Sequence, residues 1–437
     1  MKVDVLILIE FVNRELEVAV AIKHSLKTKG IKVKIISTLY DYSKAMLFYS
    51  PKILIVPYLY DDNNLKKFSM VKKSNTEELI IINMHQEQMV TKSNVEFVLP
   101  KGLAKNVLHI SWGDTFTQHL IENSVDNNLI YQTGSPRIDF YREGMTHFSI
   151  NKEKLSSEFK LNSEKKWILF AGNFPHENFT EDVITTLEKK GNKGIRKRIE
   201  NALETRGILI SWFEKLVENN PDIEFIYRPH PSENLTEELL KITKYYRNFH
   251  VIKKYVLRDW VINCDVINVW TSTSVVEGYF ANKKVNVVRP IEIPSDFEME
   301  LFRGVNYINT YKEFEKHNIQ GSLSNDLGLV EKINDHYSKV TNFSFEAISD
   351  LVIEGLKNNI KYDYKINQFY ASFVDRFRLL IRFFVERIIK LVSGQSVIKL
   401  SKLFNPNSRY RRYFNILENG DDKVTKGRIS DIENKFK

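Results

Sequence analysis

Short apolar runs alternate with longer segments of helical periodicity over residues 1–145. The segment 14–29 is typical of the helical stretches, because its apolar positions recur at helical spacing and Gly30 follows as a stop signal. Regular alternation of this kind predicts a parallel, doubly wound α/β sheet. The strands that we expect are 5–9, 33–37, 53–56, 79–83, 107–110 and 129–132.

A second alternating series begins after a polar stretch at 146–166, which is rich in Lys and Ser and is the best candidate for a linker. Helical patterns at 208–217 and 236–245 separate its strands. The long charged segment 173–205 is expected to hold an insertion or mobile loop followed by a helix. The expected strands are 167–171, 223–227, 250–252, 265–270 and 285–288.

Two successive Rossmann-like halves are the arrangement of the GT-B fold, in which two doubly wound domains face a central cleft. We therefore predict an acceptor-side domain over 1–150 and a nucleotide-donor domain over 166–360. The remaining residues, 361–437, are predicted to form a basic tail with amphipathic helices.

The segment 369–392 has the pattern of an amphipathic helix with a wide apolar face. Its polar positions are Asp375, Arg378, Arg382, Glu386 and Lys390, and its apolar positions are Phe377, Ile381, Phe384, Ile388 and Leu391. The basic residues Lys399, Lys402, Arg409, Arg411 and Arg412 follow. This tail could dock on an anionic membrane surface, or the helix could pack on the core of the protein itself.

The composition is that of an ordinary globular protein, with 43% apolar and 27% charged residues and a net charge of +9. Neither zinc-finger spacing nor an aromatic RNA-binding signature is present, so we expect no nucleic-acid partner. The single Cys264 excludes an internal disulfide. The apolar run at the N-terminus is interrupted by Asp4 and closed by Glu10, too early for a signal peptide or a membrane span. We expect a cytoplasmic protein, peripheral on the inner membrane face if the tail binds lipid.

The motif Arg228-Pro229-His230-Pro231 directly follows the predicted strand 223–227. Open α/β sheets bind ligands at the carboxyl ends of their strands, and the two prolines would fix the backbone there. Arg228 offers paired donors to a phosphate, and His230 can donate to a leaving oxygen near neutral pH. The plainer alternative is a proline-rich strand exit whose polar residues are incidental.

The motif Thr271-Ser272-Thr273-Ser274 follows the predicted strand 265–270 and precedes a helical pattern. Hydroxyl and backbone N–H groups at the start of a helix can bind an anion, and Glu277 could accept hydrogen bonds from a ribose. Ordinary N-capping is the alternative, although a cap needs only one hydroxyl. The two motifs together predict a phosphate clamp in the second half of the chain.

The candidates of the first half lie just past strand ends. Transfer to a hydroxyl requires a general base, for which Glu87, with His85 nearby, is the first choice and Asp114 the second. Glu10 lies past the first strand. The motif Gly134-Ser135-Pro136-Arg137 follows the last one, so that Arg137 and Asp139 could face the cleft, or it forms a simple turn.

Several catalytic motifs are absent from the sequence. There is no Asp-x-Asp pair, P-loop, Gly-x-Gly-x-x-Gly or zinc-binding cluster. We therefore expect no cofactor and no metal, with Arg, His and helix N-termini as the cationic groups facing a nucleotide-activated donor.

The chain resembles bacterial surface-carbohydrate biosynthesis proteins, relatives of the capsule Kdo transferases and the CDP-glycerol glycerophosphotransferases, over most of residues 3–290. The matching pieces are 10–17, with Glu10, Asn13 and Arg14, then 112–114, 133–139, 168–174, with Asn173, 228–233 and 270–277. The resemblance implies a GT-B fold and a CMP- or CDP-activated donor. It also implies that His230 contacts the donor phosphate and that Ser272, Thr273 and Ser274 hold it. Where such families carry an acidic Asp-Glu-Glu-Gly-like loop, this chain has His85-Gln86-Glu87-Gln88 and keeps only Glu87.

The leading hypothesis is a glycosyltransferase of capsule, O-antigen or other surface polysaccharide, acting on a glycan or lipid-linked acceptor. In it, Glu87, His230 and Asp114 are the candidate catalytic residues, and Arg228, Thr271 to Ser274 and Glu277 bind the donor. The residues expected to line the cleft are Glu10, Asn13, Arg14, His85, Gly134, Arg137 and Asn173. Three alternatives stay open: a CDP-glycerol or CDP-ribitol polyol-phosphate transferase, a sugar-nucleotide epimerase, and an inactive transferase-like scaffold.

Overall fold

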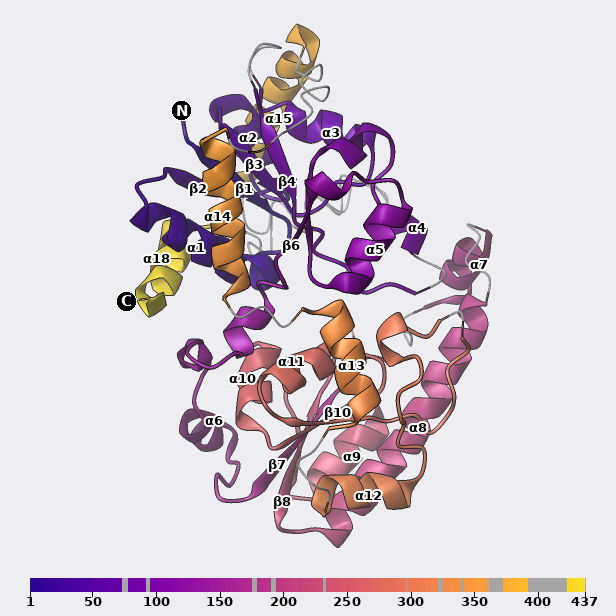
Figure 1. The fold of residues 1–437 in the computed structure, drawn as a ribbon. Coiled ribbons are helices and arrows are strands. Elements are labelled where there is room, and N and C mark those ends of the chain that lie inside the picture. The colour runs from indigo at the N-terminus through magenta and orange to yellow at the C-terminus, as the bar shows by residue number, and fades with distance from the viewer. Residues whose placement is uncertain are drawn as a thin grey trace. The chain divides into compact units, whose positions relative to one another are not determined.

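Parallel strands and helices alternate along the chain in the computed structural model (Figure 1). The structure describes residues 1–72, 78–91, 95–174, 179–189, 194–230, 233–295, 297–320, 325–338, 342–358, 360, 372–391 and 423–436. These pack as two units, the first formed by Met1–Gln88, Glu96–Arg137 and Asp335–Lys437, the second by Met89–Val95 and Ile138–Asn334.

The first unit contains a six-stranded parallel sheet in the order β2-β1-β3-β4-β5-β6. Its strands are β1 (Val5–Ile9), β2 (Val33–Ser37), β3 (Ile53–Val56), β4 (Ile80–Asn83), β5 (Leu108–Ser111) and β6 (Ile130–Gln132). All residues of β1, β3, β4 and β5 are buried, as expected for strands covered on both faces. The strand order reverses between β1 and β3, a position that favours ligand binding at the carboxyl edge.

The helices of the first unit come from both ends of the chain. Between residues 1 and 137 they are α1 (Val12–Thr28), α2 (Tyr42–Phe48), α3 (Asp62–Ser69), α4 (Val95–Val98), η1 (Gly102–Asn106), α5 (Asp114–Glu122) and η2 (Asn127–Leu129). After residue 335 they are α14 (Ser344–Leu356), α15 (Phe373–Leu391), α18 (Lys426–Glu433) and η8 (Asn434–Phe436). Because α14 and α18 pack on α1, the C-terminal segment completes the unit that the N-terminal segment begins (Figure 1).

The second unit contains a five-stranded parallel sheet in the order β11-β10-β7-β8-β9. Its strands are β7 (Lys166–Ala171), β8 (Ile223–Arg228), β9 (Phe249–Val251), β10 (Val266–Val269) and β11 (Lys284–Val287). Here the order reverses between β7 and β10.

Helix α8 forms much of the second unit's core. Phe213 on α8 packs against Phe170 of β7 and Phe225 of β8, with ring centroids 4.8 and 5.0 Å away. The helices of this unit are η3 (Ile138–Tyr141), η4 (Thr146–Phe148), α6 (Lys152–Phe159), α7 (Glu181–Lys189), α8 (Ile195–Asn219), α9 (Glu237–Tyr245), α10 (Leu257–Asn263), α11 (Ser274–Phe280), η6 (Glu300–Phe302), α12 (Tyr311–Ile319) and α13 (Leu327–His336). The core therefore fixes the sheet while leaving its carboxyl edge to polar loops.

The predicted strands are confirmed, with bounds that shift by no more than one residue. The helix expected within 173–205 is confirmed, but the segment holds α7 and the first part of α8, and α8 continues through the predicted helix 208–217. The unit bounds also differ from the predicted domains: residues 138–150 pack with the second unit, and α14 packs with the first. Sequence periodicity reports local structure, whereas these assignments depend on long-range packing.

The C-terminal helix is present as α15. The basic residues Lys399, Lys402, Arg409, Arg411 and Arg412 lie outside the described residues. Among the helices that the structure describes, none combines the length and the apolar character needed to cross a bilayer.

Candidate functional site

The carboxyl edge of the second sheet gathers the predicted donor residues. The strand register aligns Val269 of β10 with Ala171 of β7, and Ala171 with Arg228 of β8. The loops that follow these strands therefore leave the sheet side by side. Asn173 Nδ2 donates to the Thr271 carbonyl over 2.5 Å, which joins the two loops where the strand order reverses. Open α/β sheets bind ligands at this position.

Glu233 is the buried centre of this edge. One carboxylate oxygen, Oε1, accepts the Tyr227 hydroxyl and lies 3.1 Å from Arg206 Nη2. The other, Oε2, accepts the backbone N–H groups of His230 at 3.0 Å and Phe174 at 3.4 Å. A single carboxylate thus fixes the loops after β7 and β8 to each other and to α8.

Gly172 is required by the same arrangement. A Cβ atom at this position would lie 2.8 Å from the Tyr227 hydroxyl and 2.9 Å from Glu233 Oε2. Both distances are shorter than van der Waals contact, so a side chain would displace the Glu233 network. The loop after β7 can approach Glu233 closely only because residue 172 is glycine.

Arg228, at the end of β8, holds a neighbouring loop through hydrogen bonds. Its guanidinium donates to the backbone carbonyls of Lys253 at 3.0 Å, Lys254 at 3.2 Å and Tyr255 at 2.5 Å, and so holds the loop after β9. Burial lowers the pKa of Arg228, and the nearby Asp259, followed by Tyr141 and Glu277, opposes that shift. Phosphate binding by Arg228 stays a prediction, to which the structure adds this positioning role.

His230 is partly buried on the loop that Glu233 holds. Burial lowers the pKa of the imidazole, and the neighbouring Glu233 only partly offsets that shift. The side chain is therefore expected to be neutral near pH 7. A neutral imidazole can both donate and accept a proton, which suits the predicted role beside a leaving oxygen.

The hydroxyl-rich turn after β10 is internally bonded. Ser272 Oγ lies 2.7 Å from Ser274 Oγ and accepts the Ser274 backbone N–H at 3.3 Å. Thr273 occupies the N-cap position of α11 without a side-chain cap hydrogen bond. Thr271, Ser274 and Glu277 are buried, whereas Ser272 and Thr273 are partly exposed. Two of the four hydroxyl-bearing residues are therefore open to solvent.

His85, at the carboxyl edge of the first sheet, is buried and has a left-handed backbone with φ 44°. Its Nε2 lies 2.8 Å from His109 Nδ1, and His109 Nε2 lies 3.2 Å from the Lys105 carbonyl. Asn83 Nδ2 lies 3.0 Å from the same His85 Nε2, so this nitrogen sits between an amide donor and the second imidazole. Burial is the main cause that lowers the pKa of both, that of His109 to about 4. A non-glycine residue with positive φ at a strand end is a common feature of functional sites.

Glu87 and Arg14, two candidates far apart in sequence, form an ion pair. About half of each side chain is exposed, 52% for Glu87 and 45% for Arg14. Beside them, the buried Glu15 accepts the backbone N–H of Glu10 at 2.8 Å and of Phe11 at 3.3 Å, where α1 begins. Burial raises the pKa of Glu15 to about 7.

The remaining first-unit candidates lie on other elements. Asp114 is the exposed first residue of α5, and its Oδ1 accepts Gln132 Nε2 at 2.9 Å. Asn13 is exposed in the first turn of α1. Gly134 has φ 78°, which suits glycine, and Arg137 ends this part of the unit. Asp139 belongs to the second unit, where it is buried 3.6 Å from Arg142.

Four buried residues that hold these sites in place were not predicted from the sequence: Glu233, Glu15, Arg206 and His109. Glu233 and Glu15 lie within the segments 228–233 and 10–17, so the sequence does carry a signal for their positions. Arg206 and His109 carried none, because one comes from the middle of a long helix and the other from a buried strand. Only packing brings them to the edges of the sheets.

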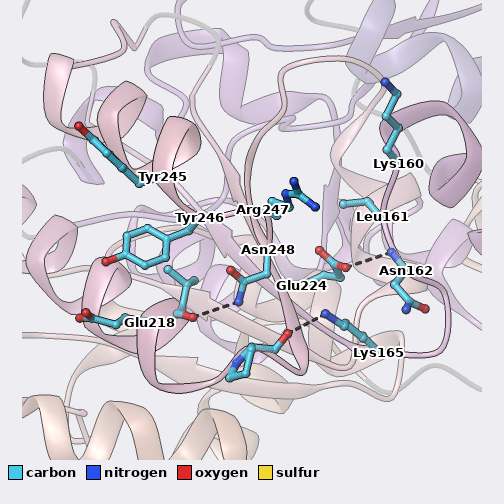
Figure 2. Close-up of a pocket in the computed structure, with 12 residues that line it drawn as sticks. Lys160, Leu161, Asn162, Lys165, Glu218, Glu224, Tyr245, Tyr246, Arg247 and Asn248 are labelled. Atoms are coloured by element: carbon cyan, nitrogen blue, oxygen red, sulfur yellow. Dashed lines mark hydrogen bonds between the residues drawn. The ribbon is translucent and has the colours of Figure 1, made fainter.

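A pocket of about 560 Å³ lies at the opposite, amino edge of the second sheet (Figure 2). Its polar walls are partly engaged with one another: Lys165 Nζ donates to the Pro221 carbonyl at 2.6 Å, and Glu224 Oε1 accepts the Asn162 N–H at 3.1 Å (Figure 2). None of the predicted donor residues lines this pocket. The pocket is therefore separate from the candidate site.

Comparison with known proteins gave matches to solved structures, but none to a family model or to a curated protein. A Listeria monocytogenes protein assigned as a UDP-N-acetylglucosamine 2-epimerase has a TM-score of 0.52 at 11% identity, over 83% of this chain and 97% of its own. S. aureus MnaA, solved with UDP, has a TM-score of 0.51 at 13% identity, over 83% and 99%. The Neisseria meningitidis UDP-GlcNAc 2-epimerase, bound to UDP-GlcNAc, has 0.50 at 12%, over 82% and 100%. The likeness shows the fold, which is the predicted GT-B type with two Rossmann-like units.

Proposed function

We propose that this chain is an enzyme that binds a nucleoside-diphosphate sugar at the carboxyl edge of its second sheet. The observation that carries the proposal is the hydrogen bond between Asn173 and Thr271, which joins two loops where the strand order reverses. Glu233 fixes the His230 loop beside them. A polar edge at this topological position is where such folds hold phosphates.

The phosphates are bound by His230, Ser272 and the backbone of the turn that follows β10. The buried Glu277 lies close enough to influence the pKa of Arg228, and it is the proposed ribose ligand. The proposed donor is UDP-activated, in place of the CMP- or CDP-activated donor expected from the sequence. Two of the structural neighbours were solved with UDP or UDP-GlcNAc, which supports uracil as the base.

The reaction that we favour is epimerisation at C2 of a UDP-activated N-acetylhexosamine. Two neighbours are named as enzymes of that reaction, which supports this candidate above the glycosyl transfer expected from the sequence. Inverting C2 requires removal of its proton while UDP leaves C1, so that the electron pair of the C2–H bond forms a C1–C2 double bond. UDP then adds back to C1 as a proton is returned to the other face of C2. His230 is suited to proton exchange because burial keeps it neutral. Glu87, which pairs with Arg14 on the first unit, is the second proposed proton carrier.

Glycosyl transfer is the second candidate. The observation that favours it is the apolar face that α15 exposes on the first unit, because lipid-linked acceptors lie at membranes. In that case Glu87 remains the candidate base for deprotonating the acceptor hydroxyl.

Nucleotide binding is the first test. Thermal unfolding of the full chain with CMP, CDP and UDP should show the largest rise in midpoint with UDP, because a ligand that binds the folded state stabilises it. Ser272→Ala and His230→Ala should reduce the rise. Ser211→Ala, on the exposed face of α8, is the matched control and should not. The binding proposal is wrong if no nucleotide shifts the midpoint.

The reaction is tested with UDP-GlcNAc alone in D₂O, followed by proton NMR. Epimerisation yields the C2 epimer carrying deuterium at C2, with no acceptor present. A transferase leaves the configuration at C2 unchanged, and it consumes the donor only after a glycan or lipid-linked acceptor is added. UDP binding without C2 exchange would therefore exclude the epimerase while retaining the nucleotide site.

A further inference from the structure

Helix α15 is anchored to the first unit by one face. It packs on α2, where Glu386 Oε1 accepts the Ser43 hydroxyl at 3.0 Å and Arg382 Nε at 2.8 Å (Figure 1). Phe383 meets Phe48 edge to face, with ring centroids 5.1 Å apart. These contacts fix the rotation of the helix about its axis.

The other face of α15 exposes an apolar stripe to solvent. The exposed fractions are 84% for Phe373, 56% for Phe377, 50% for Ile381 and 57% for Phe384. These positions follow one another at helical spacing, so they form one continuous strip. Val374, Leu380 and Val385 widen it, with exposed fractions of 54%, 39% and 47%. Single exposed apolar residues are ordinary, but a continuous strip of aromatic and aliphatic side chains marks an interaction surface.

The net positive charge of the protein is confined to the segment that carries this helix. Residues 361–437 contain 17 basic and eight acidic residues, which leaves 47 of each among residues 1–360. The whole net charge of +9 therefore belongs to the last segment. On α15 itself, Arg378 and Arg387 are exposed next to the apolar stripe.

We propose that the exposed face of α15 docks on an anionic lipid surface, with the helix axis in the plane of the membrane. Phe373, Phe377 and Phe384 enter the boundary between headgroups and acyl chains, while Arg378 and Arg387 meet lipid phosphates. A second copy of the chain fits this face less well, because pairing would bring two segments of net charge +9 together. The helix neither leaves the unit nor crosses the bilayer: its inner face keeps the contacts with α2.

Vesicle co-sedimentation of the full chain tests the inference. Vesicles of phosphatidylcholine mixed with phosphatidylglycerol should bind the protein, and vesicles of phosphatidylcholine alone should bind it much less. Phe377→Ser combined with Phe384→Ser should abolish binding. Phe97→Ser is the control, because Phe97 is an even more exposed aromatic residue (74%) and lies on α4, away from the stripe. Unchanged thermal unfolding would show that the variants remain folded, as expected for exposed positions.

The charge requirement is tested separately. Arg378→Gln and Arg387→Gln should each weaken binding about fivefold, since one basic side chain near an anionic surface contributes about 1 kcal/mol, and added salt should weaken it further. Equal binding to neutral and anionic vesicles, or full binding by the Phe377→Ser/Phe384→Ser variant, would overturn the proposal. So would a dimer in solution that dissociates on the same substitutions. UDP stabilisation that persists in these variants keeps this question separate from the nucleotide site.

Discussion

The carboxyl edges of the two sheets are organised in opposite ways. In the second unit, the edge is organised around a buried charge: Glu233 binds Arg206, Tyr227 and two backbone N–H groups, one from each of the loops after β7 and β8. In the first unit, the buried groups are the neutral pair His85 and His109 and the carboxyl of Glu15, whose pKa burial raises to about 7, whereas the charged pair of Arg14 and Glu87 is exposed.

This difference suggests a division of tasks. Binding a phosphate requires donors held in place before the ligand arrives, because reorganisation at the time of binding lowers affinity. Moving a proton requires groups whose protonation can change, which buried and mutually satisfied charges resist. The second edge has the first property. The proposed proton carriers are less enclosed, because His230 is only partly buried on the second edge and Glu87 is exposed on the first.

Replacing the buried carboxylate should produce the largest effect. Glu233→Gln keeps the shape of the side chain but removes the charge facing the buried Arg206, and we expect a loss of about 3–5 kcal/mol in unfolding free energy. Urea unfolding measures it. Glu237→Gln, an exposed glutamate in the first turn of α9, should change stability by less than about 0.5 kcal/mol. Similar losses for the two variants would contradict the central role of Glu233.

Filling the space at Gly172 should come next. Gly172→Ala places a methyl group against the Tyr227 hydroxyl and Glu233, and overpacking of this kind costs about 1–3 kcal/mol. Gly207→Ala in α8 is the matched control, because apart from the chain neighbours and the helix's own backbone no atom lies within 4 Å of the added methyl group. That variant should be neutral or stabilised by up to about 1 kcal/mol. Thermal unfolding compares the two, and a stable Gly172→Ala variant would refute the tight packing of the edge.

The histidine pair should give the first unit a dependence on acid. The folded pKa of His109 lies near 4, below its unfolded value of 6.5, so the unfolded chain takes up protons first as the pH falls. The contribution of His109 to the free energy of unfolding is therefore fully present above the unfolded pKa. It should fall by about 1 kcal/mol between pH 7 and 5.5. His109→Gln should flatten that slope, whereas His147→Gln, at an exposed position, should leave it unchanged. Parallel slopes for wild type and His109→Gln would contradict a buried neutral pair.

The exposed ion pair should contribute least to stability. A double-mutant cycle on Arg14→Gln and Glu87→Gln should give a coupling of about 0.2–1 kcal/mol, because solvent screens a pair with both partners half exposed. The same Glu87→Gln variant should reduce turnover of UDP-GlcNAc strongly if Glu87 carries a proton. A large coupling with unchanged turnover would make the pair structural and would remove the contrast between the two edges.

The sequence by itself determined the strands, their parallel arrangement and the two-fold repetition of the Rossmann-like unit. Buried parallel strands are short apolar runs with helices between them, and that pattern is local. The sequence also located the carboxyl-end motifs around Arg228 and Thr271, because strand ends can be read from where the apolar runs stop.

Only the tertiary structure decided how those motifs are supported and which side chains meet. Arg206 reaches Glu233 from α8, His109 reaches His85 from the neighbouring strand, and Arg14 meets Glu87 across 73 residues of sequence. The division of the chain was decided in the same way, since α14 returns to pack on α1. These contacts arise from packing between distant segments, and hydrophobic periodicity carries no information about them.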